Sequence, residues 1–217
     1  MDLDGTLVDT LSEITAAVNA LMREAGLDAV TEQQIYERVG EGASNLLGAF
    51  VGPSQVDRWL PVYMKHYRVI NGTTATLYPR VAEGLDAMRA AGLAIACVTN
   101  KPRELVAPLF EHLGIAERFD AIVGGGDTVD KKPLPAPLML ACTRLGVAPN
   151  ACVMIGDSIN DALAARAGGI VSLTVPYGYP GLARDEGKPE ALLARGLTRA
   201  IVPDLAAAAD WIARYEP

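Results

Sequence analysis

The stretch 93-LAIACVTN-100 decides the fold, because six apolar residues run together and two polar residues follow them. Four runs of the same kind come later in the chain, namely DAIVGGG (120–126), ACVMIGD (151–157), IVSLTV (170–175) and RAIV (199–202). Amphipathic stretches precede or separate these runs, at 81–91, 102–113, 135–146 and 158–167. Continuous apolar runs that alternate with amphipathic helices are typical of a parallel sheet covered on both faces. We therefore predict an α/β fold with a Rossmannoid core of about five or six parallel strands.

The chain ahead of this region has a helical pattern. Apolar residues recur at steps of three and four and stop at Gly26, as in a helix that ends at a glycine. Thr31, three residues before Gln34, resembles a capping box for a helix that runs to Val39. No part of 11–78 alternates like a strand. The same periodicity predicts two further helices, at 44–50 and 56–70.

These two patterns divide the chain into a core and an insertion. We predict a catalytic α/β core formed by residues 1–10 and 79–217, with an all-helical cap domain, residues 11–78, inserted into it. In an open parallel sheet, ligands bind beyond the carboxyl ends of the strands. The polar residues at those ends are therefore the first candidates for a functional site.

The composition limits the possible partners. The 217 residues carry a net charge of −7, the pI is about 4.9, and no run of Lys and Arg occurs, which argues against nucleic acid or an anionic membrane surface as partner. No apolar run approaches the ~18 residues of a membrane span, and the start lacks the regions of a signal peptide. The three cysteines have no metal-type spacing and are expected to be reduced. We expect a cytoplasmic protein that acts on a small molecule.

Two carboxylates stand close together at the start of the chain, in 1-MDLDGTLVDT-10. Asp2 and Asp4 point the same way on an extended chain, although like charges at roughly 4 Å repel by about 4 kcal/mol at an effective dielectric of about 20. Gly5 lets backbone N–H groups approach an anion closely, and Thr6 adds a hydroxyl. Paired carboxylates beside a phosphate-binding turn indicate a hard cation, and the pattern favours Mg²⁺.

Other polar residues stand at the ends of later predicted strands. Thr99 and Asn100 close one strand, Asp157 closes another, and Asp161 falls where a helix should begin. Lys132 lies just ahead of a helix start marked by prolines. Each residue alone has an ordinary structural explanation, such as a helix cap, a first-turn acid or a solvated lysine. Their joint occurrence at strand ends, in this order, indicates a shared site.

Four segments of the chain resemble the motifs of the haloacid dehalogenase-like hydrolases: DLDGTLVD (2–9), TNK (99–101), KPLP (132–135) and GDSIND (156–161). The resemblance covers essentially the whole chain and includes a helical cap inserted after the first motif. It implies hydrolysis of a phosphate monoester by an aspartate that carries the phosphoryl group. Similar dehalogenases lack an acid two residues after the nucleophile, because halide leaves without a proton. Asp4 therefore favours phosphate chemistry over C–halogen cleavage.

The resemblance also implies a role for each matched residue. Asp2 would be the nucleophile that forms the aspartyl-phosphate. Asp4 would protonate the leaving alkoxide and then activate water. Thr99 would donate its hydroxyl to a phosphate oxygen, and Lys132 would neutralise the phosphate and position Asp2. The further residues expected to bind phosphate are Gly5, Thr6 and Asn100.

The metal site implied by the resemblance holds Mg²⁺ and consists of Asp2, Asp4, Asp157 and Asp161. Asp4 would contribute its carbonyl oxygen, Asp157 would bind the ion directly, and Asp161 would support it through water. A phosphate dianion, Asp2 and Asp157 together carry more negative charge than Mg²⁺ and Lys132 can neutralise. Crowding of like charges therefore favours a protonated Asp4, which suits a proton donor.

The substrate is suggested by a closer similarity within the family, to bacterial phosphoglycolate phosphatases. It rests on LSEITAAVNALMREAGL (11–27), RVGEGASNLL (38–47), LYPRVAEGLDAMRAAGLAIACVTNKP (77–102) and MIGDSINDALAARAGG (154–169). The reaction implied is the conversion of 2-phosphoglycolate to glycolate and phosphate. In the cap, Glu41 and Gly42 belong to a turn that we expect to reach the substrate, because its glycines allow close backbone approach.

Other functions stay open at this point. A phosphosugar mutase or a broad phosphatase of small phosphate esters would carry the same motifs. A phospho-accepting receiver or a non-catalytic Mg²⁺-binding module would belong to a different class. The helical insertion argues against a receiver, which has no substrate to enclose, and steady turnover would distinguish an enzyme from both.

The sequence departs from similar proteins at two positions. Those proteins carry several apolar residues ahead of the first motif, whereas only Met1 precedes Asp2. We expect either a natural start further upstream or an almost missing central strand. Arg80 stands where a glycine is common, near the expected hinge of the cap.

Overall fold

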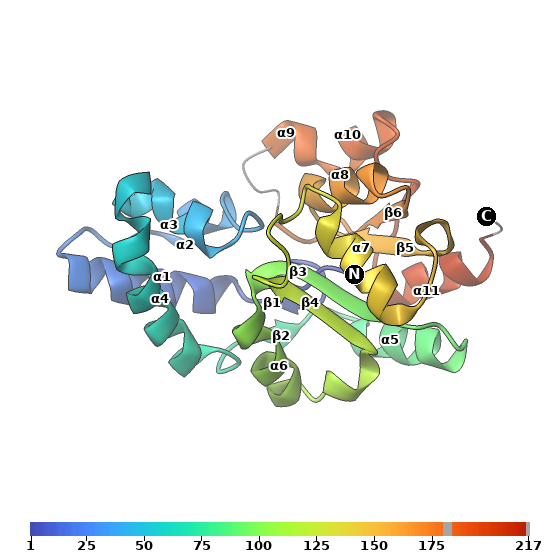
Figure 1. The fold of residues 1–217 in the computed structure, drawn as a ribbon, viewed down its shortest axis with the longest axis horizontal. Helices are drawn as coiled ribbons and strands as arrows, with labels where there is room; N and C mark the ends of the chain where they lie inside the picture. Colours follow the sequence, from blue (N-terminus) through green and yellow to red (C-terminus); the bar gives the residue numbers. More distant parts are fainter. Residues whose placement is uncertain (180–183, 216–217) are drawn as a thin grey trace.

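The computed structural model describes residues 1–179 and 184–215. Figure 1 shows the helices α1–α4 on one side of a larger part, in which strands and helices alternate along the chain. Within the described residues, no helix is both long enough and apolar enough to cross a membrane.

Five parallel strands lie in the larger part. β3 pairs with β4, and β5, β6 and β7 pair in that order. Their bounds are Ala96–Pro102, Ala121–Gly125, Val153–Gly156, Val171–Thr174 and Ala200–Ile201. Each strand overlaps one of the five apolar runs that predicted it, so the predicted α/β class is confirmed.

The first two residues of the chain join the two groups of strands. The N–H of Val98 donates to the carbonyl of Met1 at 2.8 Å, and the Met1 ammonium donates to the carbonyl of Ala96 at 2.8 Å. On the other side, the N–H of Asp2 donates to the carbonyl of Ile155 at 2.9 Å. The two residues thus occupy the centre of one sheet, between β3 and β5, where the sequence predicted an almost missing strand.

A cavity of about 370 Å³ lies beside Met1, between β3 and β5. Its walls are mostly apolar and include Ile95, Val98, Leu138 and Ile155. Unfilled apolar space therefore lies at the centre of the sheet.

Helices cover both faces of the sheet. Cys97 of β3 packs in one buried apolar cluster and its neighbour Val98 in another, because successive side chains of a strand point to opposite faces. The first cluster involves α5 (Val81–Ala90), α6 (Arg103–His112) and α11 (Leu205–Ala213). The second involves α7 (Ala136–Leu145) and α8 (Ile159–Ala167). The shorter helical elements are η2 (Ala116–Arg118), η3 (Pro149–Ala151), α9 (Arg184–Gly187) and α10 (Pro189–Ala194).

The inserted region forms the expected helices around an apolar cluster of its own, which includes Ile14, Leu21, Ile35, Leu47 and Tyr63. The helices are α1 (Leu11–Ala25), α2 (Glu32–Tyr36), α3 (Ala43–Val51), η1 (Pro53–Gln55) and α4 (Val56–Ile70). Gly26 ends α1 in a left-handed conformation, with φ of 67°. The capping box of Thr31 and Gln34 is present, but α2 ends at Tyr36 rather than at Val39.

One short strand, β2, contradicts the expectation that residues 11–78 contain no strand. β1 (Val8–Asp9) pairs antiparallel with β2 (Thr76–Leu77). Two residues are too few to produce a visible alternation, which is why the pattern missed them. The proposed division into a core, 1–10 and 79–217, and a cap, 11–78, stays a prediction.

One buried carboxylate ties the beginning of the insertion to its end. Glu13 of α1 accepts N–H groups from Gly72 at 3.1 Å, Thr74 at 2.8 Å and Ala75 at 2.9 Å. Arg80, close to this return segment, has a φ of 62° and is the one non-glycine residue in the described chain with a positive φ. Glycine adopts this backbone conformation with less strain than other residues.

Candidate active site

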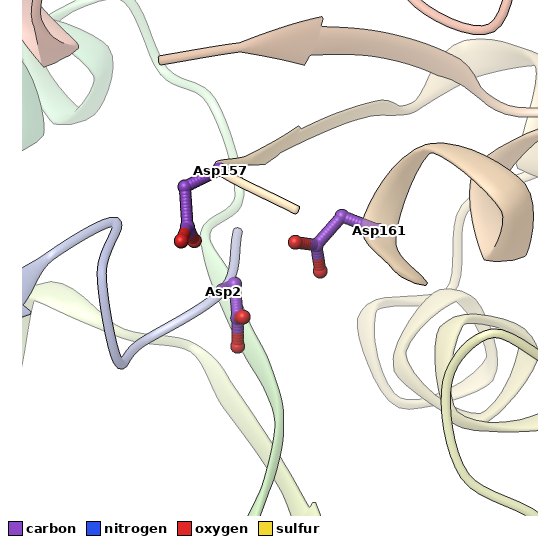
Figure 2. Close-up of side chains that lie close together, drawn as sticks. All are labelled: Asp2, Asp157 and Asp161. Atoms are coloured by element: carbon purple, nitrogen blue, oxygen red, sulfur yellow. The ribbon is translucent and has the colours of Figure 1, made fainter. Parts of the chain in front are cut away.

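Three carboxylates converge at the carboxyl edge of the sheet, as Figure 2 shows. Asp2 follows Met1 at the sheet centre, Asp157 follows β5, and Asp161 lies in the first turn of α8. An oxygen of each lies within 4.8 Å of an oxygen of the others, and all three residues are buried. Parallel strands end at the same edge, so residues far apart in the sequence meet there.

The carboxylate of Asp157 is held on both oxygens. Thr6 donates its hydroxyl to Oδ1 at 2.6 Å, and the N–H of Tyr179 donates to Oδ2 at 2.7 Å. Gly5 and Gly178 pack directly against it, since a Cβ added at either residue would come within 2.3 Å or 2.2 Å of an atom of Asp157. The Gly5–Thr6 turn therefore positions Asp157, a role that the sequence did not predict for it.

Asp161 connects its helix to the neighbouring lysine. Its Oδ2 accepts the N–H of Ser158 at 3.1 Å and the Ser158 hydroxyl at 2.7 Å, in the capping box that begins α8. Its Oδ1 accepts Nζ of Lys132 at 2.7 Å. The helix cap fixes the orientation of the carboxylate, and the lysine offsets its charge.

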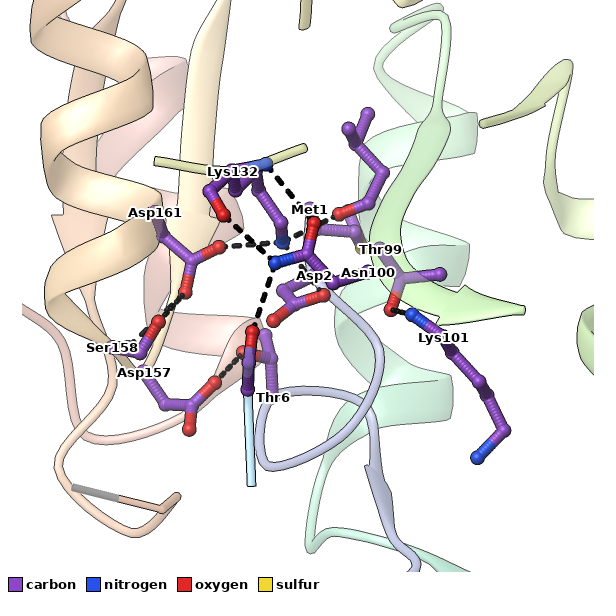
Figure 3. A network of polar contacts seen from close by, with 12 residues as sticks. Met1, Asp2, Thr6, Thr99, Asn100, Lys101, Lys132, Asp157, Ser158 and Asp161 are labelled. Atoms are coloured by element: carbon purple, nitrogen blue, oxygen red, sulfur yellow. Dashed lines mark hydrogen bonds and ion pairs between the residues drawn. The ribbon is translucent and has the colours of Figure 1, made fainter. Parts of the chain in front are cut away.

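Lys132 is the central cation of the network in Figure 3. Its Nζ lies 2.8 Å from Oδ1 of Asp2 and donates to the carbonyl of Val98 at 2.7 Å. Asn100 holds the lysine backbone on both sides: it accepts the Lys132 N–H at 3.0 Å and donates to the Lys132 carbonyl at 2.9 Å. The amide of Asn100 also donates to the carbonyl of Gly40, in the inserted region, at 2.9 Å.

The pKa values of these groups are shifted by burial and by each other. Burial raises the pKa of Asp2 to about 6, against the opposing attraction of Lys132. Burial, and then repulsion from Asp161 and Asp2, raises the pKa of Asp157. Burial alone would lower the pKa of Lys132, but the two carboxylates beside it raise it above its ordinary value. The cluster is therefore rich in negative charge and favours binding of a cation.

The oxygen atoms present fit a metal ion. Oδ1 of Asp2 is buried, and its ion-pair partner is the ammonium of Lys132, which Asp161 shares. One ammonium beside three buried carboxylates leaves negative charge that a further cation would offset. Three carboxylates within reach of one another are hard oxygen ligands, so this cluster could hold a metal ion of the kind that prefers oxygen.

The carboxylate of Asp4 lies apart from this trio. Its Oδ1 accepts the Thr10 hydroxyl at 2.7 Å and Nζ of Lys101 at 3.0 Å. Asp2 and Asp4 therefore face different cations, Lys132 and Lys101. Two carboxylates in separate surroundings can serve different functions in one reaction. The predicted metal contact of the Asp4 carbonyl oxygen stays a prediction.

Lys101 is a residue of the site that the sequence analysis missed. It is 4% exposed, its Nζ contacts the hydroxyl of Tyr67 on α4, and it lies 4.4 Å from the centre of that ring. The N–H of Lys101 donates to the Thr99 hydroxyl at 3.1 Å. The period of two along β3 could have revealed it, because residues 99 and 101 point to the same side of a strand.

A small cavity of about 40 Å³ lies above Asp2 and Asp4, between the core and the inserted helices. Thr99, Asn100 and Gly42 line it, and their contact with substrate stays a prediction. Glu41 is not among its lining residues: its carboxylate accepts the Asn45 amide at 3.2 Å, and its carbonyl accepts Nζ of Lys131 at 2.6 Å. The structure thus brings Gly42, but not the side chain of Glu41, to the cavity.

Known proteins resemble this chain in sequence and in fold. The pattern of the haloacid dehalogenase-like hydrolases matches residues 1–175. The chain is 38% identical to a phosphoglycolate phosphatase of Nitrosospira multiformis over 187 residues, which are 82% of each protein. It is 39% identical to a phosphoglycolate phosphatase of Colwellia psychrerythraea over 188 residues, 82% of this chain and 83% of that protein.

Solved structures agree with the sequence comparison. A crystal structure of a predicted phosphoglycolate phosphatase from Haemophilus somnus superposes with a TM-score of 0.85 at 27% identity, covering 97% of this chain and 95% of that one. The phosphate complex of CbbY from Rhodobacter sphaeroides has a TM-score of 0.77 at 22% identity, covers 94% of this chain and 92% of its own, and shows the same fold. From its sequence, its sheet and the four motifs that meet at one edge, the chain belongs to the haloacid dehalogenase-like hydrolase family.

Proposed function

We propose that this protein hydrolyses phosphate monoesters through an aspartyl-phosphate on Asp2, with 2-phosphoglycolate as substrate. The observation that supports this most directly is the pairing of a buried Asp2 with Lys132, beside two further buried carboxylates and below a small cavity. A nucleophile, a cation for the phosphate and a metal-binding set lie together at one sheet edge.

The proposed reaction uses the carboxyl groups of Asp2 and Asp4. A carboxylate oxygen of Asp2 attacks phosphorus, the bond from phosphorus to the ester oxygen breaks, and a protonated Asp4 gives its proton to that leaving oxygen. Asp4, now a carboxylate, takes a proton from the water that attacks the aspartyl-phosphate, and inorganic phosphate leaves. Lys132 orients Asp2 and offsets negative charge on the phosphoryl oxygens throughout.

We assign the metal site to Mg²⁺, held by the carboxylates of Asp2 and Asp157 and by the carbonyl oxygen of Asp4, with Asp161 in support. When bound, Mg²⁺ neutralises charge on the phosphoryl oxygens. Thr6, the Tyr179 N–H and the two flanking glycines keep Asp157 aimed at the ion. Thr99, which lines the cavity, donates its hydroxyl to a phosphate oxygen.

The names of the relatives, phosphoglycolate phosphatases from two bacteria, support 2-phosphoglycolate as the substrate. A receiver or a non-catalytic module would give no steady turnover.

Phosphate release from a panel of esters tests this function. Purified protein with Mg²⁺ is given 2-phosphoglycolate, hexose phosphates and nucleotides, and we expect many turnovers and a kcat/KM for 2-phosphoglycolate at least about tenfold above the others. Chelation of the metal and Asp2→Asn should each abolish release. A flat profile would remove the substrate assignment but keep the phosphatase, whereas a single stoichiometric labelling without turnover would support a receiver instead.

A further inference from the structure

The cavity above Asp2 and Asp4 is lined by a cationic side chain, Lys101, that has no role in the reaction proposed at Asp2. Among its lining residues, the cationic side chains are Arg38 and Lys101. The guanidinium of Arg38 donates to the carbonyl of Gln34 on its own side of the cavity and lies over the ring of Phe50. Lys101 is instead buried, next to Asp4.

The two buried lysines serve different sides of the cavity. Lys132 pairs with Asp2 and Asp161, on the side of the nucleophile and the carboxylate cluster. Lys101 pairs with Asp4, the residue proposed to protonate the leaving oxygen. A group bound to Lys101 therefore belongs to the alcohol portion of the substrate, close to the ester oxygen.

Lys101 has a donor left for such a group. An ammonium has three N–H donors, and in the described chain Asp4 and Tyr67 accept two of them. Only 4% of the residue is exposed, so water can do little to solvate its charge. A buried ammonium of this kind attracts an anionic ligand strongly, because the low local dielectric strengthens the interaction.

We propose that Lys101, supported by Tyr67, binds a carboxylate on the alcohol portion of the substrate and so selects carboxylated phosphate esters. This inference rests on the proposed function and gives its substrate class a structural basis. Lys101 comes from β3 and Tyr67 from α4, so the binding group is complete only when the inserted helices lie over the core. Selection of a charged substrate therefore depends on the inserted helices lying over the core.

The test compares two substrates that differ in charge at one end. 2-Phosphoglycolate carries the carboxylate, and 2-hydroxyethyl phosphate has a neutral hydroxyl in its place. We expect Lys101→Met to lower kcat/KM for 2-phosphoglycolate by roughly 10- to 100-fold more than for 2-hydroxyethyl phosphate, the size of a lost bond to a charged group. Tyr67→Phe, which keeps the ring, should reduce the preference by about threefold.

Matched variants separate this role from a structural one. Lys131→Met removes a nearby lysine whose partner is the Glu41 carbonyl, and should leave the preference unchanged. Lys101→Arg keeps the charge and should retain most of the preference, which also covers the case in which Lys101→Met fails to fold. An equal fall on both substrates would mean that Lys101 only positions Asp4 or ties the helices together, and would overturn the inference.

The wild-type protein distinguishes the two proposals. If it shows no preference for 2-phosphoglycolate over 2-hydroxyethyl phosphate, the proposed substrate and the inference both fail. If it shows the preference and Lys101→Met keeps it, the proposed function stands and only the role of Lys101 is overturned.

Discussion

The ammonium group of Lys132 lies 2.8 Å from Oδ1 of Asp2, with both residues buried. The same ammonium lies 2.7 Å from Asp161, so one cation serves two carboxylates from distant parts of the chain. Burial of a charged group is tolerated only when its partners stay in place. The stability of the protein and its proposed chemistry therefore depend on the same contact.

Replacing Lys132 should show this dependence directly. We expect Lys132→Met to lower the free energy of unfolding by about 3–5 kcal/mol, because it leaves buried carboxylates without their cation. It should also abolish phosphate release. Unfolding in urea measures the first effect and steady-state assays the second.

The adjacent lysine is the control for that experiment. Lys131 is less buried and donates to the Glu41 carbonyl, so Lys131→Met should change the free energy of unfolding by less than about 1 kcal/mol. Equal losses in the two variants would contradict the special position of Lys132.

The raised pKa of Asp2 predicts how the metal-free protein responds to pH. A carboxyl group whose pKa rises from 3.8 to about 6 on folding binds its proton more tightly in the folded state. Stability should therefore fall as pH rises from about 4 to about 6, by up to about 3 kcal/mol from this group. Thermal unfolding in EDTA from pH 4.5 to pH 8 measures the slope.

Two comparisons check the origin of that slope. Asp2→Asn has no such proton to lose, so its slope should be shallower. Saturating Mg²⁺ binds the ionised form and should stabilise the wild-type protein most at neutral pH. A wild-type protein in EDTA that becomes steadily more stable from pH 4.5 to pH 6 would contradict the raised pKa.

The close approach of Gly5 to Asp157 predicts a loss of metal affinity on substitution. Gly5→Ala adds a Cβ that would come within 2.3 Å of Oδ2 of Asp157, at a φ of 88°. Gly52 has a φ of 86° but no neighbour within 4 Å, so Gly52→Ala carries the backbone strain without the clash. We expect Gly52→Ala to lose about 1 kcal/mol of stability from backbone strain, and Gly5→Ala to lose more because of the clash. Only Gly5→Ala should weaken Mg²⁺ binding, by about tenfold or more in calorimetric titration.

Much of the site could be predicted because it depends on strand ends. Asp157 follows a buried apolar run, Asp2 lies on the central segment, and parallel strands present such residues at one edge. The convergence of Asp2, Asp157 and Asp161 needed no knowledge of side-chain packing. The role predicted for Lys132 was inferred from its motif, because the apolar pattern does not single this residue out.

The contacts between the inserted helices and the core could not be predicted in the same way. Tyr67 lies on the apolar side of α4, where the sequence pattern assigns it only to packing, yet its hydroxyl contacts Lys101. That contact depends on how two separately patterned regions pack together. Glu41 shows the opposite case, since a turn placed near the cavity directs this side chain to Asn45 instead.

The carboxylate of Glu13 accepts three N–H groups from the segment that returns to the core. Because the outgoing and returning chains are bonded to each other there, and β1 pairs with β2 just below, both links between the helical region and the sheet are fixed at one place. The last turn of α4, which carries Tyr67 and Arg68, leads into this place and contacts Lys101 and Glu104 of the core. The tie at Glu13 therefore also sets where Tyr67 meets Lys101.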